Sequence, residues 1–293
     1  MTAPRLLILG KSGQVARALV CANNAFDVLC FGRHELDLSD LASIAPKIQQ
    51  AKPAIVVNAA AFTAVDAAET QQEGAFRLNR DGPAALARAC AALGAPLVHI
   101  STDFVFDGTK GAPYVESDPL APLNVYGRSK AEGEDAVAKA DGAFAIVRSS
   151  WLYAADGNNF VRTILRLARE RGAVRVVADQ RGRPTWASDL AGALLLLAQR
   201  LLDGDPRAAG IFHYCNSGDA TWADLAEAAI EGAARRGAAP ARVERIGGAD
   251  YPTAAKRPPD SRLDCARFTA LAGAPPPDWR ASLEQCLDEI FQR

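Results

Sequence analysis

Three side chains with the chemistry of carbonyl reduction occur in order in the first half of the chain. Ser101-Thr102-Asp103 ends an apolar run, Tyr126 follows within PLNVYGRSK, and Lys130 stands four positions later. On a helix, positions i and i+4 lie on one face, so the phenol and the ammonium can reach the same cleft. The spacing predicts a site at which a tyrosine donates a proton to a carbonyl oxygen.

Each of these residue types has a distinct expected role. A phenol has an ordinary pKa of about 10, too high for easy proton exchange at neutral pH. We expect the Lys130 ammonium to lower the pKa of Tyr126 and to hold the nicotinamide ribose hydroxyls. Thr102 can hydrogen-bond the carbonyl oxygen. Because a lone Tyr-x-x-x-Lys pair is more often structural, the prediction depends on all three residues and a glycine loop occurring together.

The glycine loop GKSGQVA at 10–16 follows the apolar run RLLIL at 5–9. Gly10 permits a tight turn, Gly13 lets a pyrophosphate approach the backbone, and Ala16 lets a helix pack closely on the strand. The N-terminus of that helix would present free N–H groups to the anion. The competing interpretation is an ordinary strand-to-helix turn.

The end of the second apolar run bears on the choice of cofactor. It reads Cys-Phe-Gly-Arg, where an acidic residue would receive the 2′-hydroxyl of NAD. Gly32 leaves room and Arg33 can pair with a 2′-phosphate, so we expect NADPH, with NADH as the alternative. A merely solvated Arg33 is the competing interpretation. Residues that can flank the adenine or leave room for the middle of the cofactor are Asp37, Leu38, Ala59, Ala60 and Ala61.

Alternation of short apolar strands with helices predicts an α/β fold with a Rossmann-type doubly wound parallel sheet. In such a sheet the carboxyl ends of the strands form the ligand crevice, which is where Thr102 would lie. Strands are expected at 5–9, 26–31, 54–58, 97–101 and 143–148, with helices at about 13–22, 40–50, 71–93 and 126–140.

The second half predicts a smaller, mixed C-terminal substrate-binding domain. We assign residues 1–148 plus about 173–213 to the NAD(P)-binding domain, and about 149–172 and 214–293 to the smaller one. Helices are expected at 157–171, 187–202, 221–236 and 279–291, and a strand at 174–179. Thr221 and Asp224 predict a capping box at the start of the third of these helices.

Composition restricts the classes of partner. The 293 residues are 49% hydrophobic and carry a formal net charge of −1, with lysine and arginine spread along the chain. We therefore expect a packed globule that binds neither nucleic acid nor membrane. The longest apolar stretch, 190–198, is too short to span a bilayer. Six scattered cysteines and no cluster with metal-ligand spacing favour a reducing cytoplasm and no metal.

Seven segments, in register nearly from end to end, resemble the dTDP-4-dehydrorhamnose reductases, an atypical branch of the extended short-chain dehydrogenases. They are GKSGQVA at 10–16, VVNAAAFTAVDAAE at 56–69, STDFVFDG at 101–108, PLNVYGRSK at 122–130, RSSWLYAADGNNF at 148–160, DQRGRPTW at 179–186 and RPPDSRLD at 257–264. The resemblance implies NAD(P)H-dependent reduction of the 4-keto group of dTDP-4-dehydrorhamnose to dTDP-L-rhamnose.

Carried over by position, the resemblance implies that Thr102, Tyr126 and Lys130 form the catalytic set. The sugar nucleotide would contact Val65, Asp103, Phe104 and Trp151. The cofactor would contact Gly10, Gln14, Val15, Asp37, Leu38, Ala59, Ala60 and Ala61. We expect the remaining residues of the glycine loop, Lys11, Ser12 and Gly13, to contact it as well.

Four further side chains have two interpretations each. Trp151 can be an aromatic platform for a sugar or base, or a core tryptophan. Asn159 can bind a substrate hydroxyl, although a helix cap is the commoner role. Arg257 and Arg262 flank a proline-rich loop and can pair with diphosphate oxygens, whereas in isolation they would be surface residues.

One departure from the family concerns assembly. Some members form a dimer around a divalent metal held by glutamates on the first helix and after the DQ-x-G-x-PT segment. Here those neighbourhoods read Arg17-Ala18 and Ala187-Ser188, so a hard cation lacks carboxylate ligands. We therefore do not expect the metal-bridged homodimer and leave the oligomeric state open. Alternative functions are reduction or epimerisation of another dTDP-4-keto sugar, or a non-catalytic regulatory subunit.

Overall fold

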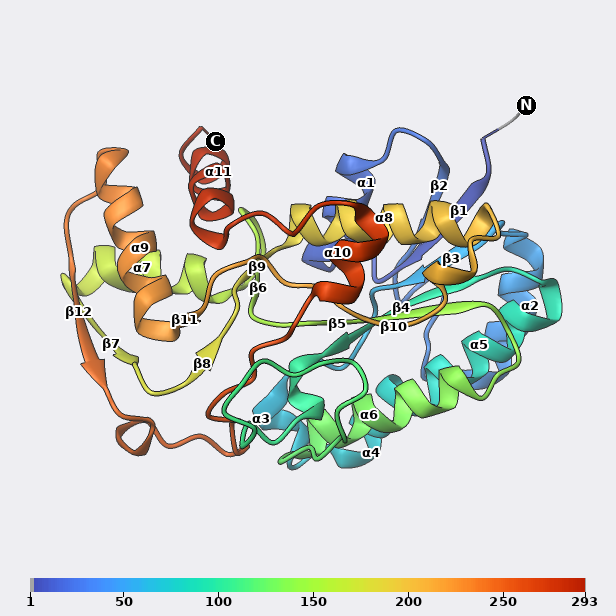
Figure 1. The fold of residues 1–293 in the computed structure, drawn as a ribbon, viewed down its shortest axis with the longest axis horizontal. Helices are drawn as coiled ribbons and strands as arrows, with labels where there is room; N and C mark the ends of the chain where they lie inside the picture. The colour runs from blue at the N-terminus through green and yellow to red at the C-terminus, as the bar shows by residue number, and fades with distance from the viewer. Residues whose placement is uncertain (1–2, 293) are drawn as a thin grey trace.

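Six parallel strands form the central sheet in a computed structural model that describes residues 3–292 (Figure 1). Their order is β2-β1-β3-β4-β5-β10, so the direction of strand addition reverses at β1. A ligand crevice is expected at such a reversal, beyond the carboxyl ends of β1 and β3. The strands are β1 (Arg5–Leu9), β2 (Asp27–Phe31), β3 (Ile55–Asn58), β4 (Leu97–Thr102), β5 (Phe144–Ser149) and β10 (Gly210–His213).

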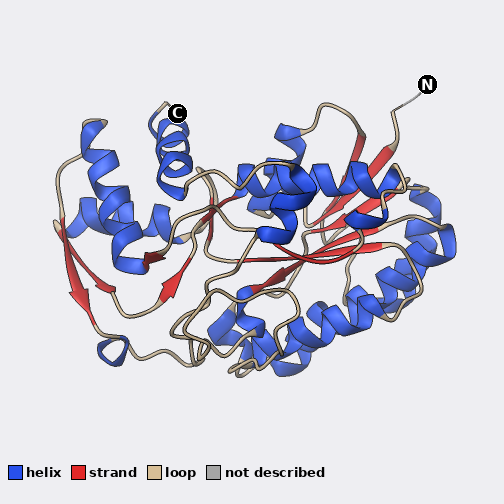
Figure 2. Cartoon of the chain, viewed as in Figure 1, coloured by secondary structure: helices blue, strands red, loops and turns tan. Residues whose placement is uncertain are grey.

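Helices cover both faces of this sheet, as Figure 2 shows. Alternate β1 residues enter different cores: Leu6 and Ile8 pack on one face, and Leu7 and Leu9 on the other. The first face is covered by α1 (Gln14–Ala22), α8 (Ala187–Leu202) and α10 (Ala266–Ala272), the second by α2 (Leu41–Ala51), α5 (Gly82–Leu93) and α6 (Val125–Ala138). The predicted fold class is therefore confirmed, and β10 is a strand that the sequence analysis did not predict.

A smaller lobe lies at one end of the sheet (Figure 1). The predicted capping box at Thr221 and Asp224 is present. The helices of the lobe are α7 (Phe160–Arg171), α9 (Trp222–Arg235) and α11 (Trp279–Phe291). Its paired strands are β6 (Leu152–Tyr153) with β9 (Thr185–Trp186), β7 (Ala173–Val177) with β12 (Arg242–Ile246), and β8 (Arg181–Gly182) with β11 (Ala220–Thr221).

One strand and one helix pack with a different part of the molecule from the one to which the predicted domain division assigned them. Strand β7 was expected with the NAD(P)-binding sheet, but it pairs in parallel with β12 in the smaller lobe. Helix α10 was expected in the smaller domain, but Phe268 and Leu271 pack into the core under α8. Both differences arise from long-range packing partners that a local apolar pattern does not identify.

The helix expected over 71–93 is interrupted. It consists of α4 (Gln72–Phe76), a π-helical turn at Arg77–Asp81, and α5. The buried Asn79 in that turn donates to the Ser129 hydroxyl of α6 at 2.9 Å and accepts from the Phe62 N–H at 2.8 Å. A Cβ on Gly133 of α6 would lie only 1.9 Å from the Asn79 carbonyl oxygen. The turn therefore holds α6 closely against the edge of the crevice.

No helix among residues 3–292 has the length and apolar character needed to cross a membrane.

Candidate active site

A cavity of about 570 Å³ opens at the carboxyl ends of the central strands. The structure brings fifteen of the predicted residues to its wall. They are Ser12, Gly13, Gln14, Val15, Ala59, Ala60, Ala61, Val65, Thr102, Asp103, Phe104, Tyr126, Lys130, Trp151 and Arg257. The predicted residues that do not line it are Gly10, Lys11, Arg33, Asp37, Leu38, Asn159 and Arg262.

The glycine loop leaves the start of α1 open to the cavity. Gly10 has a φ of +98°, and a Cβ there would lie 2.9 Å from backbone atoms of Ala59 and Ala60. Gly13 is the N-cap of α1, and no side chain caps this helix. The Oε1 atom of Gln14 is buried without a hydrogen-bond partner among the described residues. The start of α1 therefore presents free N–H groups to which an anionic ligand can bind, and the Gln14 oxygen is available to accept a hydrogen bond from a donor on the ligand.

The start of α6 is fixed by two side chains. The Asn124 side chain accepts a 2.7 Å hydrogen bond from the Gly127 N–H, and Glu69 accepts one of 2.8 Å from the Val125 N–H. A Cβ on Gly127 would lie 2.2 Å from the Phe104 carbonyl oxygen, so only glycine allows this approach. Tyr126 consequently lies beside Phe104, with an edge-to-face contact of 5.9 Å between ring centroids.

Lys130 is buried at the base of the cavity. Its Nζ donates to the Ile100 carbonyl oxygen at 2.6 Å and lies 3.4 Å from His99 Nε2. Burial lowers the pKa of Lys130 to about 8, against the opposing effect of Glu134 one turn further along α6. Lys130 is therefore mostly charged at neutral pH and loses its charge under mildly alkaline conditions.

His99 is a residue of this site that the sequence analysis missed. Burial, together with the charge of Lys130, holds its pKa well below the usual range, so the imidazole is neutral. Its Nδ1 lies 3.1 Å from the Asn58 side-chain amide nitrogen, and its Nε2 faces Lys130. The available signal was a histidine within the apolar run LVHIS, where a buried imidazole needs partners on both nitrogens.

The predicted lowering of the Tyr126 pKa by Lys130 is wrong for this structure. Burial raises the pKa of Tyr126 to about 12, with Thr102 opposing the rise and Asp103 adding to it. The Lys130 ammonium is directed to the Ile100 carbonyl instead. Desolvation of the phenolate therefore dominates, and Tyr126 keeps its proton at neutral pH, which is the form required of a proton donor.

Behind Lys130, a buried ion pair that the sequence did not predict joins α6 to the sheet. Glu134 accepts three hydrogen bonds of 2.7 to 3.1 Å from Arg148 of β5 and one from Ser101 of β4. Removing one partner of such a pair leaves a buried charge unpaired, which typically costs about 3–5 kcal/mol. The pair therefore fixes α6 relative to the two strands whose ends form the cavity.

Trp151 and Trp222 form a stacked wall of the cavity. Their rings are 3.7 Å apart at 9°, and the backbone of Trp151 has a φ of +49°. A Cβ on Gly182 of β8 would lie 2.4 Å from the Trp151 indole, so the missing side chain makes room for the ring. Trp151 is thus both packed and exposed to the cavity, which combines the two sequence interpretations.

Replacing Gly182 by alanine is expected to displace the Trp151 ring from Trp222. Overpacking of this kind typically costs about 1–3 kcal/mol, so the melting temperature should fall by several degrees. Near-ultraviolet circular dichroism should report loss of the stacked pair. Gly192→Ala on α8 is the matched control, because a Cβ there meets nothing within 4 Å. Unchanged spectrum and stability in Gly182→Ala would contradict the close approach.

Asn159 and Arg262, both predicted to bind the substrate, are not among the residues that line the cavity. Asn159 accepts from the Arg162 N–H at 3.1 Å, as the N-cap of α7, and donates to the Ala154 carbonyl oxygen at 2.9 Å. Arg262 pairs with Asp260 and Asp219 at 2.6 Å each. Their polar atoms make internal contacts, and their role in substrate binding stays a prediction.

Arg33 lies at the end of β2, beyond the cavity. Its guanidinium pairs with Asp37 at 2.9 Å, and its side chain is 79% exposed. Two hydrogen bonds from Ser39 contribute to lowering the pKa of Asp37 to about 2. Lys11 pairs with Glu35 at 3.3 Å in the same neighbourhood. Two cations therefore stand where an adenosine 2′-phosphate is expected.

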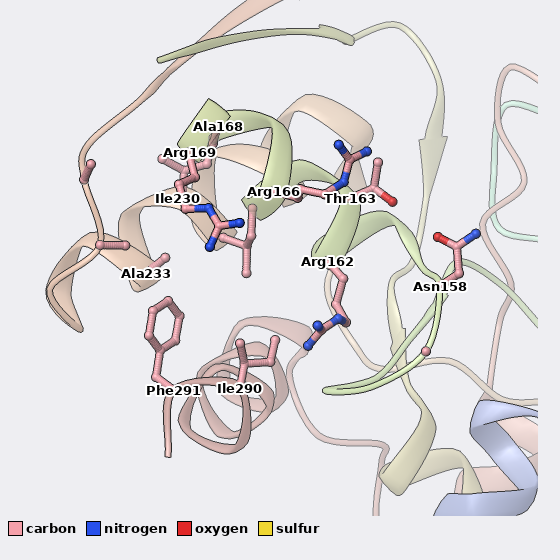
Figure 3. Close-up of a pocket in the computed structure, with 14 residues that line it drawn as sticks. Asn158, Arg162, Thr163, Arg166, Ala168, Arg169, Ile230, Ala233, Ile290 and Phe291 are labelled. Atoms are coloured by element: carbon pink, nitrogen blue, oxygen red, sulfur yellow. The ribbon is translucent and has the colours of Figure 1, made fainter. Parts of the chain in front are cut away.

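A second cavity, of about 520 Å³, lies between α7, α9 and α11 in the smaller lobe (Figure 3). Arg162, Arg166 and Arg169 of α7 line it together with the apolar Ile290 and Phe291 of α11. Arg162 donates to the Ala155 carbonyl oxygen and Arg166 pairs with Glu170, which lies outside the cavity lining. None of the predicted site residues lines this second cavity.

Comparison with known proteins places the chain in one family. The model of the RmlD substrate binding domain matches residues 4–292. A dTDP-4-dehydrorhamnose reductase of Sinorhizobium fredii is 44% identical, with 95% of each chain covered. A probable dTDP-4,6-dihydroxy-2-methyloxan-3-one 4-ketoreductase of Streptomyces antibioticus is 39% identical, covering 98% of this chain and 96% of its own.

The structural comparison agrees. The crystal structure of a dTDP-4-dehydrorhamnose reductase from Bacillus anthracis in complex with NADP has a TM-score of 0.90 to this chain. It is 33% identical, over 98% of this chain and 100% of its own. Because the similarity extends over nearly the whole chain in both sequence and structure, the protein belongs to the dTDP-4-dehydrorhamnose reductase family.

Proposed function

We propose that this protein reduces the 4-keto group of dTDP-4-dehydrorhamnose to the alcohol of dTDP-L-rhamnose, with NADPH as the reductant. The observation that carries the proposal is the position of Thr102, Tyr126 and Lys130 around one cavity that also receives the open start of α1. The names of the similar reductases support the substrate, and the NADP bound to the Bacillus anthracis enzyme supports the cofactor.

The residues of the cavity fit a dinucleotide. The uncapped start of α1 can bind a diphosphate through backbone N–H groups, and the unpartnered Gln14 Oε1 can accept a hydrogen bond from the ligand. Small side chains at Ala59, Ala60 and Ala61 leave room beside the strand ends. When bound, the reduced nicotinamide supplies the hydride that adds to the carbonyl carbon.

The side chains of the protein supply the proton. Tyr126 is protonated at neutral pH and donates its proton to the carbonyl oxygen as the hydride arrives at carbon, so the products are an alcohol and a phenolate. The Lys130 ammonium, which donates to the Ile100 carbonyl oxygen in this structure, would have to turn toward that phenolate to stabilise it by its charge. Thr102 orients the carbonyl oxygen. Its hydroxyl now donates to Asp103 Oδ1 at 3.1 Å and must turn toward the substrate.

The remaining wall of the cavity suits a sugar diphosphate. Asp103 is buried at the wall of the cavity, and its carboxylate can accept from a sugar hydroxyl. Burial raises the pKa of Asp103 to about 6, so it is largely ionised at neutral pH. Phe104, Val65 and Trp151 present apolar surface, and Arg257 presents a guanidinium suited to phosphate oxygens.

The test is consumption of NADPH, and separately of NADH, when dTDP-4-dehydrorhamnose is supplied. Stoichiometric oxidation with formation of dTDP-L-rhamnose, identified by NMR, is expected. No oxidation of either cofactor would remove the assignment. Purified protein that carries tightly bound NAD and returns an epimerised keto sugar would support the epimerase alternative, and nucleotide binding without any turnover would support a regulatory subunit.

A second candidate is reduction of a related 4-keto sugar nucleotide, favoured by the similarity to the Streptomyces antibioticus 4-ketoreductase. The discriminating measurement is kcat/KM for both keto sugars under the same conditions. A ratio that favours the other substrate by tenfold or more would select the second candidate.

Replacing Arg33 by alanine is expected to raise the KM for NADPH about fivefold, because an exposed charge-assisted contact to phosphate is of order 1 kcal/mol. The KM for NADH should stay unchanged, since that cofactor lacks the 2′-phosphate. Steady-state kinetics with both cofactors measures this. A parallel change in the two KM values would show that Arg33 does not select between them.

We also propose a cytoplasmic location, which fits six cysteines that are scattered along the sequence without close pairs. A homodimer remains a prediction. A metal-bridged form is not expected. Where some family members have a metal-binding glutamate on the first helix, this chain has Arg17, which pairs with Asp156 at 2.9 Å. Among residues 3–292, no group of three or more histidine, cysteine or acidic side chains is arranged to hold a metal ion.

A further inference from the structure

Asp66 lies on the short helix α3 (Val65–Ala68) and binds the loop that carries Arg257. Its Oδ1 accepts a 3.0 Å hydrogen bond from the Ala255 N–H, and its Oδ2 accepts one of 2.7 Å from Arg257 Nη2. Burial opposes ionisation of Asp66, but these donors hold its pKa below the usual range. One carboxylate therefore contacts both the backbone and the guanidinium of the same loop.

Arg257 is ordered by these contacts at the wall of the active-site cavity. Its side chain is only 21% exposed, and its Nη1 donates to the Ala255 carbonyl oxygen at 3.2 Å. Its guanidinium carbon lies 6.0 Å from the centre of the Phe104 ring, which in turn contacts Tyr126. A guanidinium has five N–H donors, so donors remain for a ligand in the cavity.

A second contact fixes the same loop to the catalytic helix. Asn124, the N-cap of α6, donates from its side chain to the Lys256 carbonyl oxygen at 2.8 Å. Glu69, at the end of α3, accepts from the first N–H of α6. Helix α3, the start of α6 and residues 255–257 therefore form one junction, in which the position of Arg257 is set relative to Tyr126.

We propose that Asp66 is a positioning residue for the substrate: it holds Arg257 so that the guanidinium meets the diphosphate of a nucleoside-diphosphate sugar in a fixed orientation to Tyr126. This inference rests on the proposed function for the nature of the substrate. The Asp66 side chain is 47% exposed, so the ion pair contributes little to folding. Its effect is to order a long side chain before the ligand arrives, which removes part of the entropic cost of binding.

The test is a double-mutant cycle on the affinity for dTDP, measured by isothermal titration calorimetry. The variants are Asp66→Asn, Arg257→Ala and the pair. Asparagine can still accept from the Ala255 N–H, so the loop keeps its backbone contact while the guanidinium loses its charged partner. We expect Asp66→Asn to weaken dTDP binding about tenfold in the parent and less than twofold in the Arg257→Ala background.

Kinetics give the second readout. Asp66→Asn should raise the KM for the sugar nucleotide while kcat and the KM for NADPH stay within twofold of the parent. Asp135→Asn, which breaks the exposed ion pair with Lys139 near the far end of α6, is the matched control and should change none of these values. If Asp66→Asn leaves dTDP affinity unchanged, or weakens it equally in both backgrounds, the proposal is overturned.

Calorimetry also separates this inference from the proposed function. If the parent binds dTDP but does not reduce the rhamnose precursor, the proposed function fails, and the coupling of Asp66 to Arg257 is still decided by the cycle. If the parent turns over the precursor and the two substitutions act additively, the positioning role fails and the function stands. A parent that does not bind dTDP overturns the positioning role.

Discussion

Replacing Tyr126 by phenylalanine is expected to reduce turnover of the keto sugar by about 10²–10⁴-fold, the usual contribution of a positioned proton donor. The phenyl ring retains the edge contact with Phe104, so the packing of α6 should be preserved. The affinity for NADPH should stay close to that of the parent, because the substitution removes only one hydroxyl. Stopped-flow measurement of NADPH oxidation, with binding followed by fluorescence, tests both parts.

Tyr251→Phe is the matched control for this experiment, because Tyr251 is 58% exposed and lies outside the cavity lining. It should behave as the parent. A Tyr126→Phe variant that reduces the keto sugar at the parent rate would show that another group donates the proton.

Replacing Lys130 by methionine is expected to lower turnover by at least about a hundredfold and to weaken NADPH binding. Methionine fills the buried volume but supplies no charge for the phenolate and no donor to the Ile100 carbonyl oxygen. Lys139→Met is the matched control, because Lys139 follows the same helix and its side chain is 74% exposed. Parent activity in Lys130→Met would contradict the assigned role.

The charge of Lys130 also predicts a pH dependence. Burial lowers its pKa to about 8, so the group is charged below that pH and neutral above it. Tyr126, with its pKa raised to about 12, keeps its proton throughout this range. The turnover of the parent should therefore fall as pH rises through about 8, and the residual activity of Lys130→Met should lack this decline. A parent rate that is constant or rises through about 8 would contradict the assignment.

The sequence was sufficient for those parts of the fold that local pattern determines. Strands β1, β3, β4 and β5 are mostly buried and read as apolar runs, and the predicted strand at 97–101 matches β4 closely. The order of Thr102, Tyr126 and Lys130 was informative because a strand end and one helical turn suffice to bring them together. The capping box at Thr221 could also be predicted, because it involves only Thr221 and Asp224, three positions apart.

The features that the sequence did not reveal depend on contacts between distant residues. The pairing of β7 with β12 joins segments far apart in the chain, and the Asp66–Arg257 pair joins residues 191 positions apart. The pKa of Tyr126 was predicted in the wrong direction, because the degree of burial and the direction of the Lys130 side chain are properties of the packed molecule. The spacing of residues in the sequence indicates neither the burial of Tyr126 nor the direction of the Lys130 side chain.

The central claim is that hydride from the nicotinamide is delivered to the 4-keto carbon of a dTDP-linked sugar in the cavity bordered by Tyr126. Its most direct test uses NADPH deuterated at the transferring position, incubated with dTDP-4-dehydrorhamnose and the parent enzyme. We predict dTDP-L-rhamnose with one deuterium at the sugar C4 and one NADP⁺ formed per sugar, as read by NMR and mass spectrometry. Recovery of the sugar without deuterium at C4, or without cofactor oxidation, would contradict the account.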